Sequence, residues 1–178
     1  MIYTSEYTSP LGALTLAGDG EALTGLWFNG QKYFGSTLPA SAERWELPLF
    51  TEVKERWLTP YFAGQQPTFI PPLRYDATPF RKAVCDVMLT IPYGSTMTYG
   101  QIAAQVAAQM GRAQMSAQAV GGAVGHNPIS LIIPCHRVVG TNGSLTGYAG
   151  GVVRKVQLLE LEGADMTRLF VPGRGTAL

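Results

Sequence analysis

The 178-residue sequence has few charged residues and no long hydrophobic run, and each shortage excludes a class of protein. Charged residues make up 14% and hydrophobic residues 46% of the chain, the reverse of a disordered composition. No apolar stretch approaches the roughly 18 residues that a membrane span requires. The first residues lack a basic segment leading into an apolar one, so we expect no secretory signal. These observations favour a compact cytoplasmic protein that does not contact a membrane.

Cysteine and histidine are also scarce, with two of each. Cys85 and Cys135 are too few for a disulfide scaffold. Together with the histidines they show neither the CxxC nor the HxxxH spacing that is typical of metal sites. We therefore expect two free thiols, no metal and no cofactor.

A proline-rich stretch ending at Pro71-Pro72 divides the chain into halves of opposite charge. Residues 1–72 hold four Lys or Arg and seven Asp or Glu, net −3, whereas residues 73–178 hold nine and five, net +4. We predict one domain over 1–72 and a second over 73–178. A basic half can approach a polyanion, but so small a surplus is common on solvated surfaces and does not identify a nucleic-acid-binding protein.

The N-terminal half has an α+β pattern. Residues 11–17 and 23–28 are apolar runs around the glycine turn 18–20, which predicts two strands. Apolar residues then recur at three- and four-residue intervals from Leu49 to Tyr61, which predicts an amphipathic helix ending near Gly64.

The C-terminal half has helical patterns with clear starts. Thr78 with Pro79 opens one helix, the T-x-x-Q pair Thr98 and Gln101 opens a second, and Ser116 caps a third over 117–124. A last amphipathic helix runs from Val152 to about Glu162. The second and third helices form either a helix-turn-helix or an ordinary αα-hairpin, and their spacing leaves both open. The small residues of the third helix favour close approach by another helix or by a nucleic acid.

The segment with the most chemical character follows the third helix. Leu131-Ile132-Ile133 predicts a buried strand that leads into Cys135, His136 and Arg137. His136 and Arg137 could stabilise the thiolate form of Cys135, which is the nucleophilic form. The alternative is that Cys135 is a small core residue, since free cysteines are often buried. Neighbours on an extended segment point to opposite faces, so a water molecule would have to bridge Cys135 and His136. Glu162 either orients His136 or faces solvent.

These residues resemble a known family, the methylated-DNA–protein-cysteine (O6-alkylguanine-DNA) alkyltransferases. The resemblance is strongest at residues 133–140 (IPCHRVVG) and covers residues 76 to 163, including 98–103 (TYGQIA), 119–123 (AVGGA), 147–151 (GYAGG) and 158–163 (LLELEG). It implies an α+β protein with an N-terminal ribonuclease-H-like sheet domain and a C-terminal winged-helix-like domain that contains a helix-turn-helix.

The resemblance also implies a reaction. Cys135 would accept the alkyl group of O6-alkylguanine, and of O4-alkylthymine, irreversibly. His136 would relay the thiol proton through water, and Glu162 would hold His136 in place. Asn127 would brace the turn around the site, and Tyr99 would donate a hydrogen bond to the departing guanine.

The implied partner is double-stranded DNA, bound in the minor groove by a monomer that flips the damaged base out of the stack. The residues implied to contact DNA are Ser116, Ala117, Gln118, Ala119, Gly121, Gly122 and Arg112. Those implied to form the lesion pocket are Val124, Ser130, Val138, Tyr148, Ala149 and Gly150.

One of the departures from the family bears directly on DNA binding. Gln118 stands where the family usually places the arginine that fills the gap left by the flipped base, which predicts weaker flipping unless Arg112 substitutes for it. The departure leaves a protein that binds alkylated DNA without transfer as an alternative. A cysteine hydrolase and a helix-turn-helix regulator are further alternatives.

Overall fold

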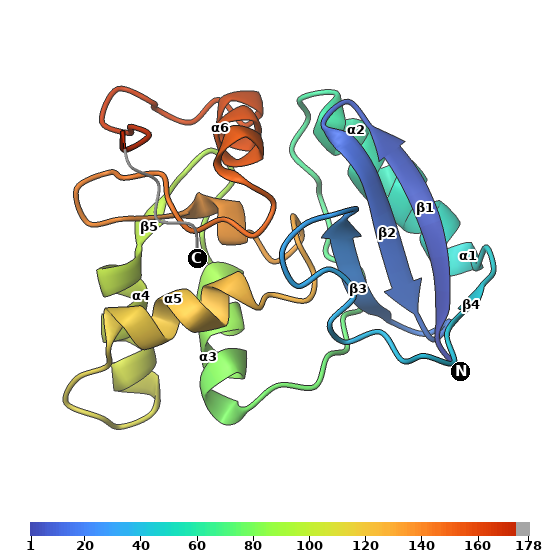
Figure 1. Ribbon diagram of the computed structural model, residues 1–178, viewed down its shortest axis with the longest axis horizontal. Coiled ribbons are helices and arrows are strands. Elements are labelled where there is room, and N and C mark those ends of the chain that lie inside the picture. The colour runs from blue at the N-terminus through green and yellow to red at the C-terminus, as the bar shows by residue number, and fades with distance from the viewer. Residues whose placement is uncertain (174–178) are drawn as a thin grey trace. The chain divides into compact units, whose positions relative to one another are not determined.

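The computed structural model describes residues 1–173, which fold into two compact units. The first unit consists of Met1–Asp76 together with Pro128–Ile132, and the second of Ala77–Asn127 together with the chain from Ile133 onward. Figure 1 shows a sheet backed by helix in the first and a group of helices in the second. The fold is therefore α+β, as predicted. Within residues 1–173 no helix is long and apolar enough to cross a bilayer.

The sheet of the first unit has four strands in the order β3-β2-β1-β4. β1 (Tyr3–Ser9), β2 (Gly12–Gly18) and β3 (Leu23–Phe28) are antiparallel neighbours, and β4 (Glu43–Arg44) runs parallel to β1. The two strands predicted from the apolar runs are confirmed as β2 and β3. The sequence pattern did not reveal β1 or β4.

One continuous helical segment covers the sheet behind β1 (Figure 1). It consists of α1 (Pro48–Val53), a π-helical turn η1 (Lys54–Leu58) and α2 (Thr59–Phe62). The apolar face predicted from the spacing is buried, including Phe50 and Tyr61. The predicted helix is confirmed, with one turn widened.

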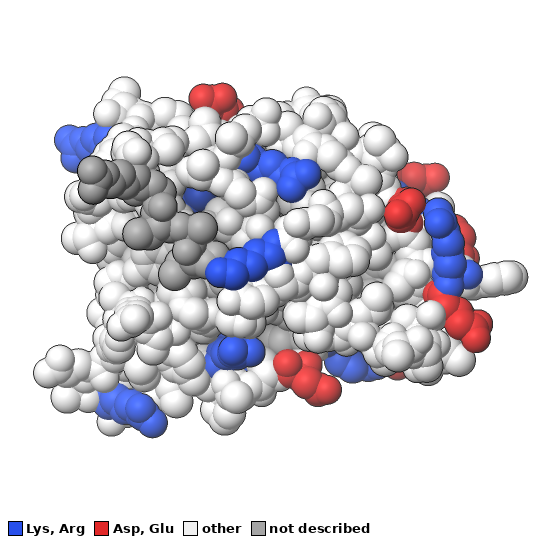
Figure 2. Space-filling view, viewed as in Figure 1, with Lys and Arg blue, Asp and Glu red and all other residues white. Residues whose placement is uncertain are grey.

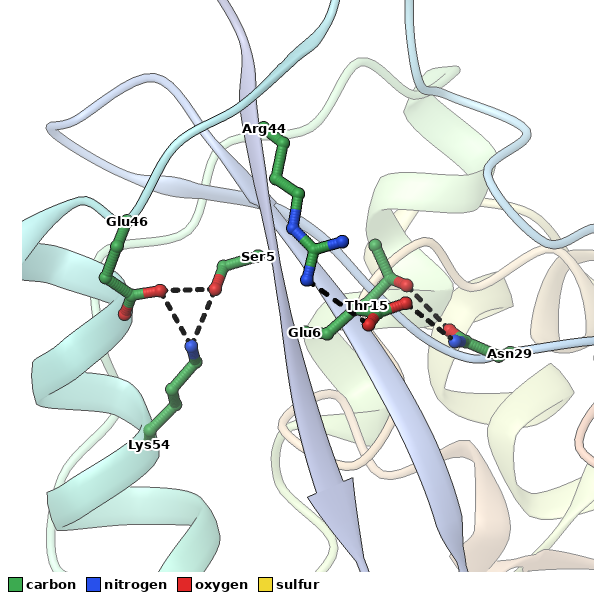
Figure 3. Close-up of polar contacts among 7 residues, drawn as sticks. All are labelled: Ser5, Glu6, Thr15, Asn29, Arg44, Glu46 and Lys54. Atoms are coloured by element: carbon green, nitrogen blue, oxygen red, sulfur yellow. Dashed lines mark hydrogen bonds and ion pairs between the residues drawn. The ribbon is translucent and has the colours of Figure 1, made fainter.

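Polar contacts fasten this helix and the strands to one another (Figure 3). The Lys54 ammonium donates to Ser5 Oγ at 2.6 Å and to Glu46 Oε2 at 2.8 Å, and the Ser5 hydroxyl donates to the same carboxylate. On the neighbouring strands, Thr15 Oγ1 donates to Asn29 Oδ1 at 2.6 Å. The contacts of Lys54 fix the helix against β1, and the Thr15–Asn29 bond joins β2 to the residue that follows β3.

A short segment from late in the chain completes the first unit. Leu26 N donates to Pro128 O and Ser130 N donates to Leu26 O, both at 2.9 Å, so residues 128–130 pair with β3. The strand predicted over 131–133 is wrong. Those residues are buried, but Leu131 has φ +70° and Ile132 N donates to Ser130 O, so the backbone turns there. An apolar run reports burial and does not distinguish a strand from a buried turn.

The second unit contains the four predicted helices: α3 (Pro79–Met88), α4 (Tyr99–Gln109), α5 (Ala117–Gly125) and α6 (Val152–Leu161). The predicted caps are present, since the side chains of Thr78, Thr98 and Ser116 each accept a backbone N–H of the helix they precede. A two-stranded parallel sheet, β5 (Met97–Thr98) with β6 (Val138–Val139), lies beside α4.

The turn between α4 and α5 begins with a Schellman motif. Gly111 adopts φ +65°, Gly111 N donates to Ala108 O and Arg112 N donates to Ala107 O. The left-handed conformation at Gly111 ends α4 and sets the direction of the chain toward α5.

Candidate active site

Cys135 begins a single 3-10 turn, η2 (Cys135–Arg137), and its backbone N–H donates to Ile133 O at 2.8 Å. The sequence predicted an extended segment here, and the tight turn corrects that prediction. Neither Cys135 nor Cys85 forms a disulfide, as predicted, and Cys135 is 4% exposed. Cys85 packs in the core on α3. The nucleophile is therefore held on a turn within the second unit.

The environment of Cys135 pulls its pKa in two directions. Burial raises the pKa of the thiol, whereas a hydrogen bond with Asn127 and the charge of Lys155 lower it. Asn127 also donates its Nδ2 to Ile133 O at 2.7 Å. Asn127 thus joins the end of α5 to the turn that carries the thiol.

His136 and Glu162 form a buried pair, with Nε2 and Oε2 2.6 Å apart and both side chains inaccessible to solvent. Burial would raise the pKa of Glu162, but hydrogen bonds from His136 and Arg137 outweigh it and hold that pKa far below its usual value. Burial lowers the pKa of His136 below 6.5, although Glu162 opposes this shift. The imidazole is therefore neutral at pH 7 and donates from Nε2, which leaves Nδ1 as an acceptor for a proton.

Arg137 holds the Glu162 carboxylate from the other side, a role that the sequence did not reveal. Its Nε donates to Oε1 at 2.8 Å and its Nη2 to Oε2 at 3.1 Å, in a bidentate pair. Its Nη1 donates to Ile91 O at 2.8 Å. The backbone N–H of Gly94 also donates to Oε1 at 3.1 Å. Arg137 therefore fixes Glu162 and does not serve as the cation of the thiolate.

Lys155 is a second residue of the site that the sequence did not predict. It lies on α6 and is 0% exposed, and its Nζ donates to the carbonyls of Val138 at 2.5 Å and Thr146 at 2.9 Å. Burial lowers the pKa of Lys155 to about 8, and the charge of an ionised Cys135 opposes this shift.

Two tyrosines flank the thiol. Burial and the charge of Cys135 raise the pKa of Tyr99 to about 12, and its hydroxyl donates to Thr146 O at 3.3 Å. The ring of Tyr148 lies 6.5 Å from that of His136, and within residues 1–173 its buried hydroxyl has no hydrogen-bond partner. Burial raises the pKa of Tyr148 well above its usual value, and so does the charge of Cys135. Both tyrosines keep their protons at neutral pH.

The other predicted pocket residues lie in different places. Val124 is buried on α5, and Ala149 lies between Tyr148 and Gly150. A Cβ at Gly150 would come within 2.5 Å of the Tyr148 ring, so this position requires glycine. Ser130 belongs to the first unit, where its hydroxyl lies 3.5 Å from Gln31 Oε1.

The residues predicted to contact DNA form the exposed side of α5 and of the turn before it. Six of the seven, all except the buried Gly121, are exposed: Arg112, Ser116, Ala117, Gln118, Ala119 and Gly122. A Cβ at Gly122 would meet nothing within 4 Å, so neighbouring protein does not require this glycine. Charged side chains are sparse on the face drawn in Figure 2. Two cations of the basic half, Arg137 and Lys155, are buried and add little to the surface charge.

Among residues 1–173 no group of three His, Cys, Asp or Glu side chains could hold a metal ion. The arrangement offers instead a thiol, a neutral imidazole whose orientation is fixed by a carboxylate, and protonated tyrosines. Such a set suits a nucleophilic displacement at a carbon atom.

Comparisons with known proteins agree with this chemistry. The profile described as "6-O-methylguanine DNA methyltransferase, ribonuclease-like domain" matches residues 2–75, and that of the "DNA binding domain" matches residues 79–164. The chain is 44% identical over 164 residues to the methylated-DNA–protein-cysteine methyltransferase of Mycobacterium tuberculosis, covering 91% of this chain and 93% of that protein. It is 38% identical to the Haemophilus influenzae protein of the same name, covering 90% and 86%.

A solved structure extends the agreement to three dimensions. The crystal structure of Mycobacterium tuberculosis OGT in complex with DNA has a TM-score of 0.77 and 43% identity, covering 90% of this chain and 91% of that one. The sequence and structural matches span both units. The chain belongs to the methylated-DNA–protein-cysteine methyltransferase family.

Proposed function

We propose that this protein repairs DNA by moving the alkyl group of O6-alkylguanine, and of O4-alkylthymine, onto Cys135. The observation that carries the proposal is the buried thiol on the same turn as His136, whose imidazole is held by Glu162. A protein that only binds lesions needs no such acceptor.

The transfer is a displacement at the alkyl carbon. The Cys135 thiol gives its proton through a water molecule to Nδ1 of His136, and ionised Glu162 stabilises the resulting imidazolium. The sulfur–carbon bond forms as the carbon–O6 bond breaks, and the electron pair moves onto the guanine. The Tyr99 hydroxyl then donates to the developing negative charge on the base. Cellular reductants do not reverse a thioether, so each molecule repairs one base.

For DNA recognition, we propose that a monomer places α5 in the minor groove and flips the damaged base into a pocket beside Cys135. The exposed alanines and Gly122 support this proposal because they let the α5 backbone approach the walls of a narrow groove. Val138, Tyr148, Ala149 and Gly150 would line the pocket, with Val124 as a further member. The acceptor and the DNA-contacting helix would then both belong to the chain after residue 72.

Intact mass spectrometry tests the transfer directly. After incubation with a duplex that contains O6-methylguanine, the wild-type protein is expected to gain about 14 Da, one methylene, at Cys135. Cys85→Ala is expected to gain the same mass because Cys85 is a core residue on α3. Cys135→Ala should gain none. Tight binding of the lesion without a change in mass would contradict the proposal and favour the binding-only alternative.

Gln118 gives a second prediction. An uncharged glutamine lacks the planar guanidinium that can stack and contact phosphate, so Gln118→Arg is expected to speed transfer from duplex DNA several-fold. Transfer from the free base O6-benzylguanine should not change, since that substrate needs no flipping. The measurement is the single-turnover rate with each substrate, with Gln114→Arg in the preceding turn as the matched control. An equal acceleration by both variants would point to general charge attraction and not to the flipping step.

A further inference from the structure

Lys155 is an unusual buried cation. Its ammonium is inaccessible to solvent, and its hydrogen-bond partners are two backbone carbonyls, those of Val138 and Thr146. Within residues 1–173 it forms no ion pair with an aspartate or glutamate. A buried charge is expensive unless another charge compensates it, so the fold must retain this lysine for a reason other than packing.

The groups that face Lys155 identify the compensating charge. Cys135 from η2 interacts electrostatically with it, and so does His136, which is neutral at pH 7. Tyr99 from α4 shares the Thr146 carbonyl with it and is protonated. Glu162, on the same helical segment, is already paired with Arg137 and His136. The remaining group that can supply a negative charge to Lys155 is the Cys135 thiolate.

The two carbonyls that Lys155 joins are also part of the site. Val138 lies three residues after the nucleophile, and Thr146 lies two residues before Tyr148. The ammonium thus ties the strand that leaves the nucleophile to the loop that carries the second tyrosine. Its position is fixed by both contacts and by the burial of α6 around it.

We propose that Lys155 is a positioning residue for alkyl transfer, which holds the Val138 and Thr146 carbonyls in place and stabilises the thiolate form of Cys135 with its charge. The inference rests on the proposed function, because it concerns the same thiol. Arg137, two residues after Cys135, is engaged with Glu162 and does not stabilise the thiolate. The inference assigns that electrostatic role to Lys155 on α6.

Two substitutions separate the charge of Lys155 from its hydrogen bonds. Lys155→Gln keeps an amide donor and removes the charge, whereas Lys155→Arg keeps the charge. Lys82→Gln, which removes an exposed lysine on α3, is the matched control. All variants are made in a Cys85→Ser background. For each, the rate of methyl transfer, the pH midpoint of Cys135 carbamidomethylation by iodoacetamide and the melting temperature are measured.

The charge role predicts a specific pattern. Lys155→Gln should slow transfer about 100-fold, as expected for loss of one electrostatic contact to a reacting group. It should also move the pH midpoint of the thiol upward by about one unit, because a nearby positive charge favours the ionised form. Lys155→Arg should recover at least tenfold of the lost rate and most of the shift in midpoint. Lys82→Gln should match the wild type.

Other results would overturn the inference. A folded Lys155→Gln with a wild-type midpoint, or equal losses in both Lys155 variants that follow their melting temperatures, would show a role in folding alone. Failure of both variants to fold would lead to the same conclusion. The carbamidomethylation measurement uses no DNA, so it tests Lys155 even if the wild-type protein were to transfer no methyl group. That result would contradict the proposed function itself.

Discussion

Replacing Glu162 by glutamine is expected to lower the free energy of unfolding at pH 7 by about 3–5 kcal/mol, because the change leaves the charge of Arg137 buried without its partner. Arg137 donates to both carboxylate oxygens and cannot swing into solvent without breaking its bond to Ile91 O. Urea unfolding measures the effect. Glu160→Gln, at an exposed position on the same helix, is the matched control and should change stability by less than about 0.5 kcal/mol.

The loss of unfolding free energy in Glu162→Gln should also depend on pH. The pKa of Glu162 in the folded protein lies far below its ordinary value of 4.5, so its stabilisation is fully present above that value. It is lost progressively as the pH falls from about 4.5 toward the folded pKa. The difference in stability between wild type and Glu162→Gln should therefore be constant from pH 7 to about pH 4.5 and narrow as the pH falls from 4.5 to 3. Stability curves that stay parallel over this range would show that the carboxylate is not the group responsible.

Replacing His136 by glutamine is expected to slow methyl transfer by about 100- to 10,000-fold, the usual contribution of a general base. Glutamine can still hydrogen-bond to Glu162 but cannot take up the thiol proton. Single-turnover transfer from a duplex containing O6-methylguanine gives the rate. His126→Gln provides the control, since His126 is the only other histidine and lies at the end of α5.

The pH profile separates a base from a structural group. Because burial lowers the pKa of His136 below 6.5, the ring is neutral at pH 7 and protonation should slow transfer only below pH 6.5. His136→Gln should lack that acid limb and retain only the dependence on thiol ionisation. An acid limb of the same shape in both proteins would assign it to another group.

The sequence predicted elements that have local signals and missed those that lack them. Caps and apolar spacing were sufficient for α3, α4, α5 and α6, and apolar runs for β2 and β3. β1 has no such run, because its buried positions are the polar Ser5 and Ser9. Its place in the sheet depends on pairing with β2, which no local pattern encodes.

The catalytic cysteine and its partners were predicted through a resemblance in sequence. Arg137 was predicted only as a cation beside the thiolate and not as the partner of Glu162, and Lys155 was not predicted. A lysine or arginine is normally solvent-exposed, so composition gives no hint that these two are buried. A signal was nevertheless present in α6. Lys155 and Glu162 occupy the same stripe as Val152 and Leu159, at spacings of three and four residues. A charged residue within the apolar stripe of a helix is therefore a candidate for a buried side chain with a functional role.

The pairing of residues 128–130 with β3 has a consequence for synthesis on the ribosome. The first unit lacks its last hydrogen-bonded segment until Pro128–Ile132 has been translated, 56 residues after Asp76. At about 5–20 residues per second, this interval lasts roughly 3–11 s. During that time Leu23 is already paired with Pro72 and Arg74, but the backbone N–H and C=O of Leu26 at the outer edge of β3 are unpaired, and such an edge is where aggregation starts. Chaperone capture of the nascent chain should therefore be greatest before residue 132 leaves the exit tunnel and fall once this segment docks.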